Sequence, residues 1–134
     1  MVRTMRILFV EVPILGGLVL AAAGFAAGWG VRHLWIEPTA IGILCDEGLA
    51  QPWWCAPRAA LIAAVQAWPG RALAPALAVL PWLARGQAAA RRLGLLALLV
   101  AGTGLVLYNA GPAVVALVAA GLRLIRLEKA APQA

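Results

Sequence analysis

Cys45 and Cys55 are the residues whose type and spacing most directly suggest chemistry in this sequence. Two cysteines allow one intramolecular bridge, and both lie in segment 32–56, which is the longest polar-leaning part of the chain. Closing a loop of about ten residues stabilises a fold by about 2–3 kcal/mol in the chain-entropy model. We therefore expect a structural disulfide between Cys45 and Cys55.

A metal site is the second chemistry that this segment suggests. His33 is the only histidine of the sequence, and it stands near both cysteines and near Asp46 and Glu47. Zinc accepts such ligands, but their spacing matches no recurring metal motif. The sequence also contains no CxxC, HExxH or GxxxxGK[ST] pattern. We expect no metal, no cofactor and no enzymatic activity.

The composition indicates whether this chain folds in water or in a lipid bilayer. Of its 134 residues, 64% are hydrophobic and only 12% are charged, and the mean hydropathy is +0.92. Soluble chains are about 45–50% apolar and about 25% charged. A chain this short has too few charges to cover its surface in water, because small domains have much surface for their volume. These figures exclude a soluble domain and predict an all-α polytopic integral membrane protein.

The apolar stretches predict about four transmembrane helices in a single transmembrane domain, 1–134. A crossing of the hydrocarbon layer needs about 20 apolar residues. The expected helices are 12–31, 57–84, 93–108 and 112–127, with an outer loop at 32–56. The stretch 57–84 is either one tilted helix or two helices broken at 69–70. Trp68-Pro69-Gly70 favours the break, which places Arg71 at the outer headgroups instead of in the hydrocarbon.

The basic residues predict the orientation. The net charge of +6 comes from eleven basic residues that lie singly or in pairs between apolar runs. No basic stripe with interleaved aromatic residues is present, so nucleic acid is not an expected partner. Basic residues gather on the cytoplasmic side of membrane proteins. With both termini cytoplasmic, the outer side holds Arg32 and Arg58, Arg71 is undecided, and the inner side holds Arg3, Arg6, Arg85, Arg91, Arg92, Arg123, Arg126 and Lys129.

Small residues recur at helical spacing in two of the expected helices. Such stripes let membrane helices approach closely, either within one chain or between subunits. Both alternatives stay open. The predicted packing residues are Gly17, Ala21, Gly24 and Gly28 in the first helix and Gly94, Ala97, Ala101 and Gly104 in the third.

The predicted layout resembles two families in outline. Four helices with cysteines in an outer loop resemble the quinone-linked disulfide-forming membrane oxidases, which implies a thiol–disulfide redox role for Cys45 and Cys55. That family has a CxxC and a second cysteine pair, whereas this chain has neither. Four short helices with a carboxylate in the first are similar to the small multidrug exporters, which implies a proton-coupled transporter using Glu11. Glu11 also suits the positive end of the first helix dipole.

The sequence thus favours a non-catalytic function. Polar groups that could serve catalysis or transport are scattered over different depths, whereas lipid-facing surface and small-residue stripes are abundant. We expect an accessory, structural or assembly subunit of a larger membrane complex, with the lipid bilayer and other membrane subunits as partners. Alanine-rich sequence with arginine in place of lysine is typical of bacteria, and we expect a multi-pass protein of the bacterial inner membrane.

Overall fold

The computed structural model describes residues 13–46 and 51–130, and the described part of the chain contains helices and no strand. Three stretches are long and apolar enough to cross a membrane: Ile14–Ile36, Gln87–Val106 and Ala110–Lys129. The predicted fold class, an all-α polytopic membrane protein, is confirmed. The elements are α2 (Pro13–Val31), the π-helical turn η1 (Arg32–Ile36), α3 (Thr39–Asp46), α4 (Cys55–Gln66), α5 (Trp68–Leu83), α6 (Gln87–Val106) and α7 (Ala110–Lys129).

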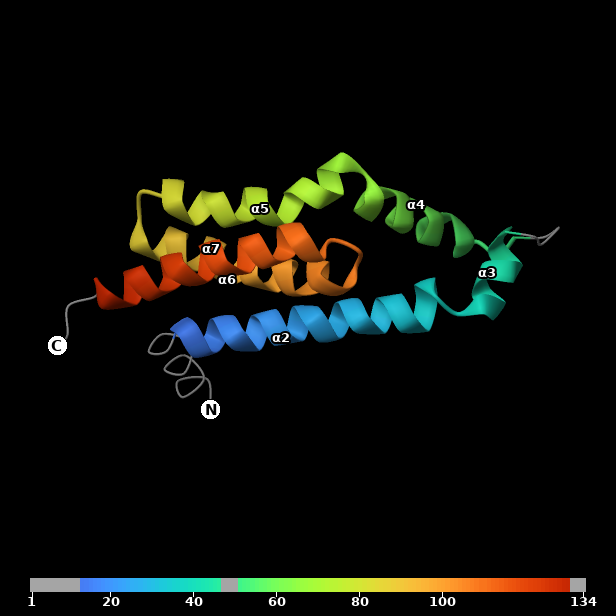
Figure 1. Ribbon diagram of the computed structural model, residues 1–134, viewed down its shortest axis with the longest axis horizontal. Coiled ribbons are helices and arrows are strands. Elements are labelled where there is room, and N and C mark those ends of the chain that lie inside the picture. The colour runs from blue at the N-terminus through green and yellow to red at the C-terminus, as the bar shows by residue number, and fades with distance from the viewer. Residues whose placement is uncertain (1–12, 47–50, 131–134) are drawn as a thin grey trace.

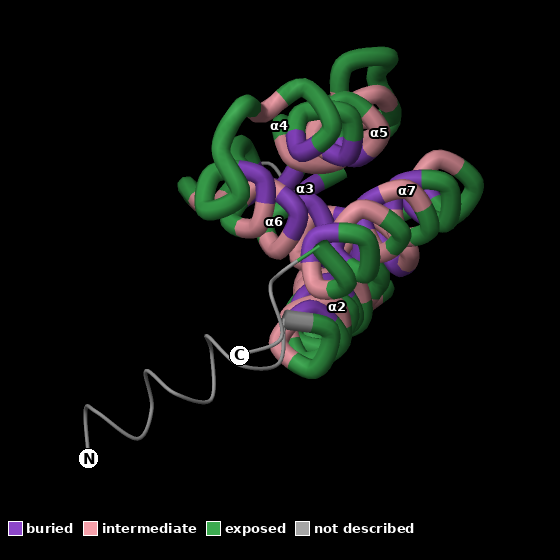
Figure 2. The backbone as a smooth tube through the Cα atoms, turned by 90° about the vertical axis from the view of Figure 1, so that its left-hand side faces the viewer, coloured by how far each residue is buried: buried purple, intermediate pink, exposed green. Residues whose placement is uncertain are grey.

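An antiparallel hairpin of α6 and α7 forms the centre of the molecule (Figure 1). Helix α2 packs mainly on α6, while α5 packs on both α6 and α7. The view along the helices shows α2 and α5 on opposite sides of this hairpin, with the buried positions turned inward (Figure 2). We call the end that carries η1, α3, α4 and the α6–α7 turn the cap end. The end that carries the α5–α6 turn and the last turns of α7 is the basic end.

Alanine makes up most of the core. Membrane helices associate through close packing rather than through a hydrophobic force, because lipid tails are as apolar as leucine. Large apolar side chains accordingly face outward, among them Leu18 of α2 and Val115 of α7. The central cluster of buried residues consists of Ala74, Ala78, Ala90, Ala97, Leu98, Ala101, Ala116, Ala120, Leu124 and Leu127.

The stretch 57–84 is two helices in the structure. Helix α4 has 12 residues and α5 has 16, and Ala67 between them is extended, with ψ 159°. Pro69 lies in the first turn of α5, where its missing N–H removes no helical bond. At about 1.5 Å per residue, α5 spans about 24 Å, which is short of the ~30 Å hydrocarbon layer. Helix α5 is not among the three spans above, so a fourth crossing stays a prediction.

The described residues of the expected outer loop 32–56 are largely helical. The first helix continues beyond Val31 through η1, where the Glu37 N–H donates to the Arg32 carbonyl at 2.8 Å. Helix α3 follows after a short bend, and residues 47–50 lie outside the described ranges. Helix α6 begins before the expected bound of 93 but ends at Val106, short of the expected 108, whereas α7 extends beyond its expected bounds of 112–127 at both ends. Long arginine side chains such as Arg92 can reach the interface from within a helix, so a charge does not end the element.

Candidate functional site

A disulfide between Cys45 and Cys55 joins the end of α3 to the start of α4, as predicted, with a Cα–Cα distance of 5.5 Å. Both residues are buried, at 6% and 5% exposure. The Gln51 side-chain amide donates to the Cys45 carbonyl beside the bridge. Thiol–disulfide exchange needs access for an attacking thiolate. The burial therefore favours a structural bridge over a redox centre.

Arg58 is the buried charge of the cap end and lies one turn after Cys55. Its Nη2 donates to the Ile36 carbonyl at 2.8 Å, and its Nε donates to the Trp35 carbonyl at 3.3 Å. These carbonyls lie at the C-terminal end of η1, where a positive charge is favourable. Arg58 thus caps the end of the first long helix. The sequence indicated only its side of the membrane, because the carbonyls that it caps lie 22 and 23 residues away.

Arg32 ties the end of the first helix to the α6–α7 turn. Its Nε donates to Glu37 at 2.5 Å, its Nη1 donates to the Val106 carbonyl at 3.0 Å, and its guanidinium lies 4.6 Å from the centre of the Tyr108 ring. His33 Nδ1 lies 2.8 Å from the second oxygen of Glu37. The hydrogen bond from Arg32 holds the pKa of Glu37 below its ordinary value. The sequence neighbours of His33 suggest a zinc ligand, although no metal is expected from their spacing; the structure pairs His33 with Glu37.

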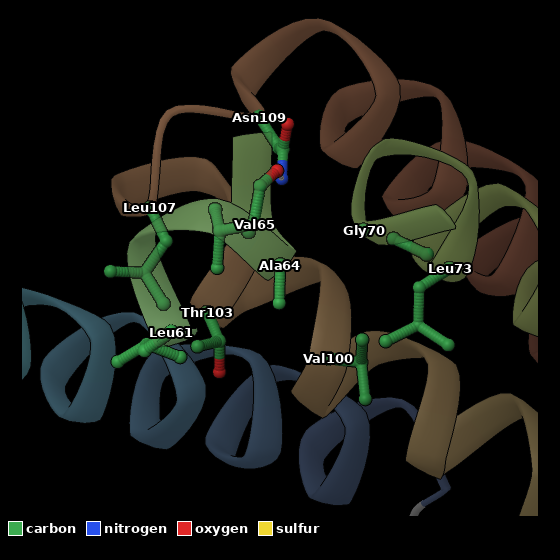
Figure 3. A pocket seen from close by; sticks show the side chains of 11 residues that line it. Leu61, Ala64, Val65, Gly70, Leu73, Val100, Thr103, Leu107 and Asn109 are labelled. Carbon is green, nitrogen blue, oxygen red and sulfur yellow. Dashed lines mark hydrogen bonds between the residues drawn. The ribbon is translucent and has the colours of Figure 1, made fainter. Parts of the chain in front are cut away.

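A cavity of about 330 Å³ lies beneath the cap end, between α4 and α5 on one side and α6 on the other (Figure 3). Thr103 is turned back to its own helix, where its hydroxyl donates to the Leu99 carbonyl at 3.1 Å. Asn109 donates from Nδ2 to the Val65 carbonyl at 3.1 Å. The cavity can therefore hold an apolar group but presents no converging set of catalytic side chains. Its walls are formed by Leu61, Ala64, Val65, Gly70, Leu73, Ala74, Val100, Thr103, Gly104, Leu107 and Asn109.

The glycine stripe of α2 faces α6. Gly17, Gly24 and Gly28 are buried, while the residues around them are mostly exposed. A Cβ atom added at Gly28 would lie 2.9 Å from the Thr103 carbonyl oxygen, and one at Gly24 would meet the backbone of Leu99. The contact of this stripe is therefore internal, which is one of the two alternatives that the sequence left open.

The predicted stripe of α6 lies mainly against α7 instead of α2. A Cβ atom at Gly94 would contact Leu124, and one at Gly104 would contact Ala113 at 3.3 Å. Ala97 and Ala101 are fully buried in the core. The glycine of α6 that packs closely against α2 is Gly102, whose added Cβ would meet the backbone of Ala21. Sequence reasoning missed Gly102 because it fits the same helical spacing on a neighbouring face.

Two further predicted residues complete the survey. Glu11 lies outside the described ranges. Arg71 is exposed at the cap end of α5, beside Trp68 and close to Pro112 of α7. Within residues 13–46 and 51–130, no group of three or more His, Cys, Asp or Glu side chains could hold a metal ion.

In comparisons with known proteins, the chain matches no protein-family model, no curated protein and no solved structure.

Proposed function

We propose that this protein is a small, non-catalytic accessory or assembly subunit of a larger complex in the bacterial inner membrane. The observation that carries the proposal is an open, apolar groove between α2 and α7. The groove has a volume of about 370 Å³ and no charged residue in its walls. Its lining residues are Ile14, Gly17, Leu18, Ala21, Leu98, Leu117, Gly121, Leu124 and Ile125.

The polar groups of the described part support this proposal because they serve the fold. Arg58 and Asn109 are the buried polar side chains, and both donate to backbone carbonyls. In the described ranges no buried side-chain nitrogen or oxygen lacks a partner. An active site or a transport pathway needs polar groups that are available to a substrate. The cap end therefore suits a rigid structural element better than a catalytic centre.

The groove suits a partner's transmembrane helix because one of the small residues that line it is not covered by the chain itself. Gly17 and Ala21 of α2 already pack against Leu98 and Gly102 of α6, whereas Gly121 of α7 has no such neighbour. A Cβ atom built on Gly121 meets nothing within 4 Å, so the groove is open at this position. A helix that entered there would approach the backbone of α7 closely at Gly121, and such close packing drives association in lipid.

The test fills the groove and leaves the internal packing unchanged. A Gly121→Leu variant places a side chain in the open space, and Gly111→Leu is the matched control, because an added Cβ there also meets nothing within 4 Å. Each protein is purified in mild detergent, and co-purifying chains and cofactors are identified by mass spectrometry. We expect wild type and Gly111→Leu to carry the same membrane subunits at fixed stoichiometry and Gly121→Leu to lose them with an unchanged melting temperature. Recovery without any partner, or equal recovery by both variants, would contradict the proposal.

The proposal also includes an orientation in the membrane, with both termini on the cytoplasmic side. The α5–α6 turn and the last turns of α7 lie at the same end of the molecule (Figure 1). This basic end carries Arg85, Arg91 and Arg92 around the turn, together with the basic residues of α7. The positive-inside rule favours this end in the cytoplasm. Fusion of alkaline phosphatase after Glu47 or Asn109 is expected to give high activity. Fusion after Gly86 or Lys129 is expected to give low activity, and the reverse pattern would refute the orientation.

A further inference from the structure

Two arginines of α7 gather around one tryptophan at the basic end. The Cζ atoms of Arg123 and Arg126 lie 5.5 and 5.1 Å from the centre of the Trp82 ring. The indole is held in place because its Nε1–H donates to the Ala119 carbonyl at 3.3 Å. Two like charges are thus brought to the same aromatic ring in the last turn of α5.

Neither arginine has a carboxylate partner in the part of the chain that the structure describes. The ion pairs there join Arg32 and His33 to Glu37, at the opposite end of the molecule. Glu128 is the acid closest in sequence, and it forms no ion pair with either arginine. Since like charges at short range repel, an anion from outside the chain would stabilise this arrangement.

The geometry also leaves donors for such an anion. Arg123 uses its Nε to cap the Pro81 carbonyl at 3.0 Å, and its Nη atoms have no acceptor in the described ranges. Arg126 is exposed and makes no side-chain hydrogen bond there. A guanidinium presents five N–H donors in a planar fork that matches phosphate oxygens.

The position of the cluster at the end of an apolar helix indicates the source of the anion. Trp82 lies at the end of an apolar helix, and tryptophan is typical of the headgroup level of a bilayer. We propose that Trp82, Arg123 and Arg126 form a binding site for the phosphate of an anionic phospholipid in the leaflet at the basic end. The apolar surface of α5 and α7 next to the cluster, including Leu83 and Leu122, is exposed to the acyl chains. This site is independent of the groove between α2 and α7.

The experiment titrates detergent-solubilised protein with dioleoyl phosphatidylglycerol and counts the bound lipids by native mass spectrometry. The test variants are Arg126→Gln and the pair Arg123→Gln with Arg126→Gln. The matched control is the pair Arg85→Gln with Arg92→Gln, which removes two charges of exposed residues at the same end. A basic side chain directly beside the lipid phosphate contributes about fivefold to affinity, so we expect about fivefold weaker binding for Arg126→Gln and about 25-fold for the double variant. The control pair should lose less than about twofold, because its charges lie outside the site.

Three outcomes would overturn the proposal. Equal weakening in the control pair would show a diffuse field instead of a site. Equal affinity of the wild type for phosphatidylcholine would exclude selection for an anionic lipid. Displacement of the lipid by inorganic phosphate at the same concentration would identify a site for small anions. Arg126→Gln removes no protein hydrogen bond of the described part, so its melting temperature without lipid should equal that of wild type. A lower melting temperature would reveal a folding defect in this variant.

Discussion

Asn109 closes a gap in the backbone hydrogen bonding of Val65, although the two residues are 44 positions apart. A continuing helix would satisfy the Val65 carbonyl with the N–H of residue 69, but that residue is Pro69 and has no N–H. The side chain of Asn109 supplies the missing donor, with an Nδ2–O distance of 3.1 Å. Its own backbone N–H and carbonyl bond to Gly104 and Ala113. One residue therefore shapes the α6–α7 turn and secures the break between α4 and α5.

Substitution of Asn109 should destabilise the protein. Asn109→Ala leaves a partly buried carbonyl without its donor, and such a loss costs about 1–3 kcal/mol. Asn109→Asp keeps the size of the side chain but removes both N–H donors, so it should be at least as destabilising. Thermal unfolding in detergent measures the effect, with Gln66→Ala, an exposed residue of α4, as the control. If Asn109→Ala and Gln66→Ala had the same melting temperature, the hydrogen bond from Asn109 to the Val65 carbonyl would contribute nothing to stability.

The glycine stripe of α2 should tolerate no larger residue at its contact with α6. A Cβ at Gly24 would lie 3.1 Å from the Thr103 nitrogen, and backbone cannot move aside as a flexible side chain can. Gly24→Leu and Gly28→Leu should each lower the free energy of unfolding by about 1–3 kcal/mol or more. Gly30→Leu is the matched control, because a Cβ there meets nothing within 4 Å. Equal melting temperatures for Gly24→Leu and Gly30→Leu would show that α2 does not pack on α6 in this way.

The stability of the cap end should depend on the guanidinium group of Arg58 and not on its positive charge alone. It donates to the carbonyls of both Trp35 and Ile36, and the planar guanidinium can reach two acceptors with fixed geometry. Charged hydrogen bonds contribute about 1.5–3 kcal/mol, so Arg58→Ala should be destabilising by about this amount. Arg58→Lys should restore only part of the loss. Full rescue by lysine, measured by thermal unfolding, would show that charge is sufficient.

The disulfide should stabilise the cap end without any catalytic role. The bridge links residues ten positions apart, and in the chain-entropy model a loop of this size contributes about 2–3 kcal/mol. We expect no free thiol when the denatured, non-reduced protein is treated with an alkylating reagent. A Cys45→Ser, Cys55→Ser variant should melt at a lower temperature but keep its copurifying subunits. Two labelled cysteines in the wild type would contradict the bridge.

Stability should fall on acidification because of Glu37. Its carboxylate is stabilised by the Arg32 hydrogen bond, so its folded pKa lies below the ordinary value of 4.5. A group with a lowered folded pKa contributes stability above its unfolded pKa and loses it as the pH falls through the folded pKa. Melting temperatures between pH 7 and pH 3 should therefore drop below about pH 4.5. Glu37→Gln should reduce this drop in melting temperature, whereas Asp46→Asn, also at the cap end, should leave the drop unchanged. Identical dependence of the melting temperature on pH in the wild type and both variants would show that Glu37 is not the cause.

Composition and local pattern determined much of this protein. The scarcity of charged residues predicted a membrane protein. The apolar runs predicted helices close to the observed α2, α6 and α7. The position of the two cysteines predicted their bridge, and the breaker around Pro69 indicated where α5 begins. These signals are local, because hydropathy, helix breaking and loop closure depend on neighbouring residues.

Tertiary structure alone decided which surfaces meet. Glycine and alanine recur so often in this chain that helical spacing could not choose between Gly102 and the residues of the predicted stripe, and only the packing of α2 selected Gly102. The partners of Arg58, Asn109 and Arg123 are backbone carbonyls, which every residue carries. No sequence pattern can mark them as acceptors, because a carbonyl needs a side-chain donor only where the fold interrupts its helix.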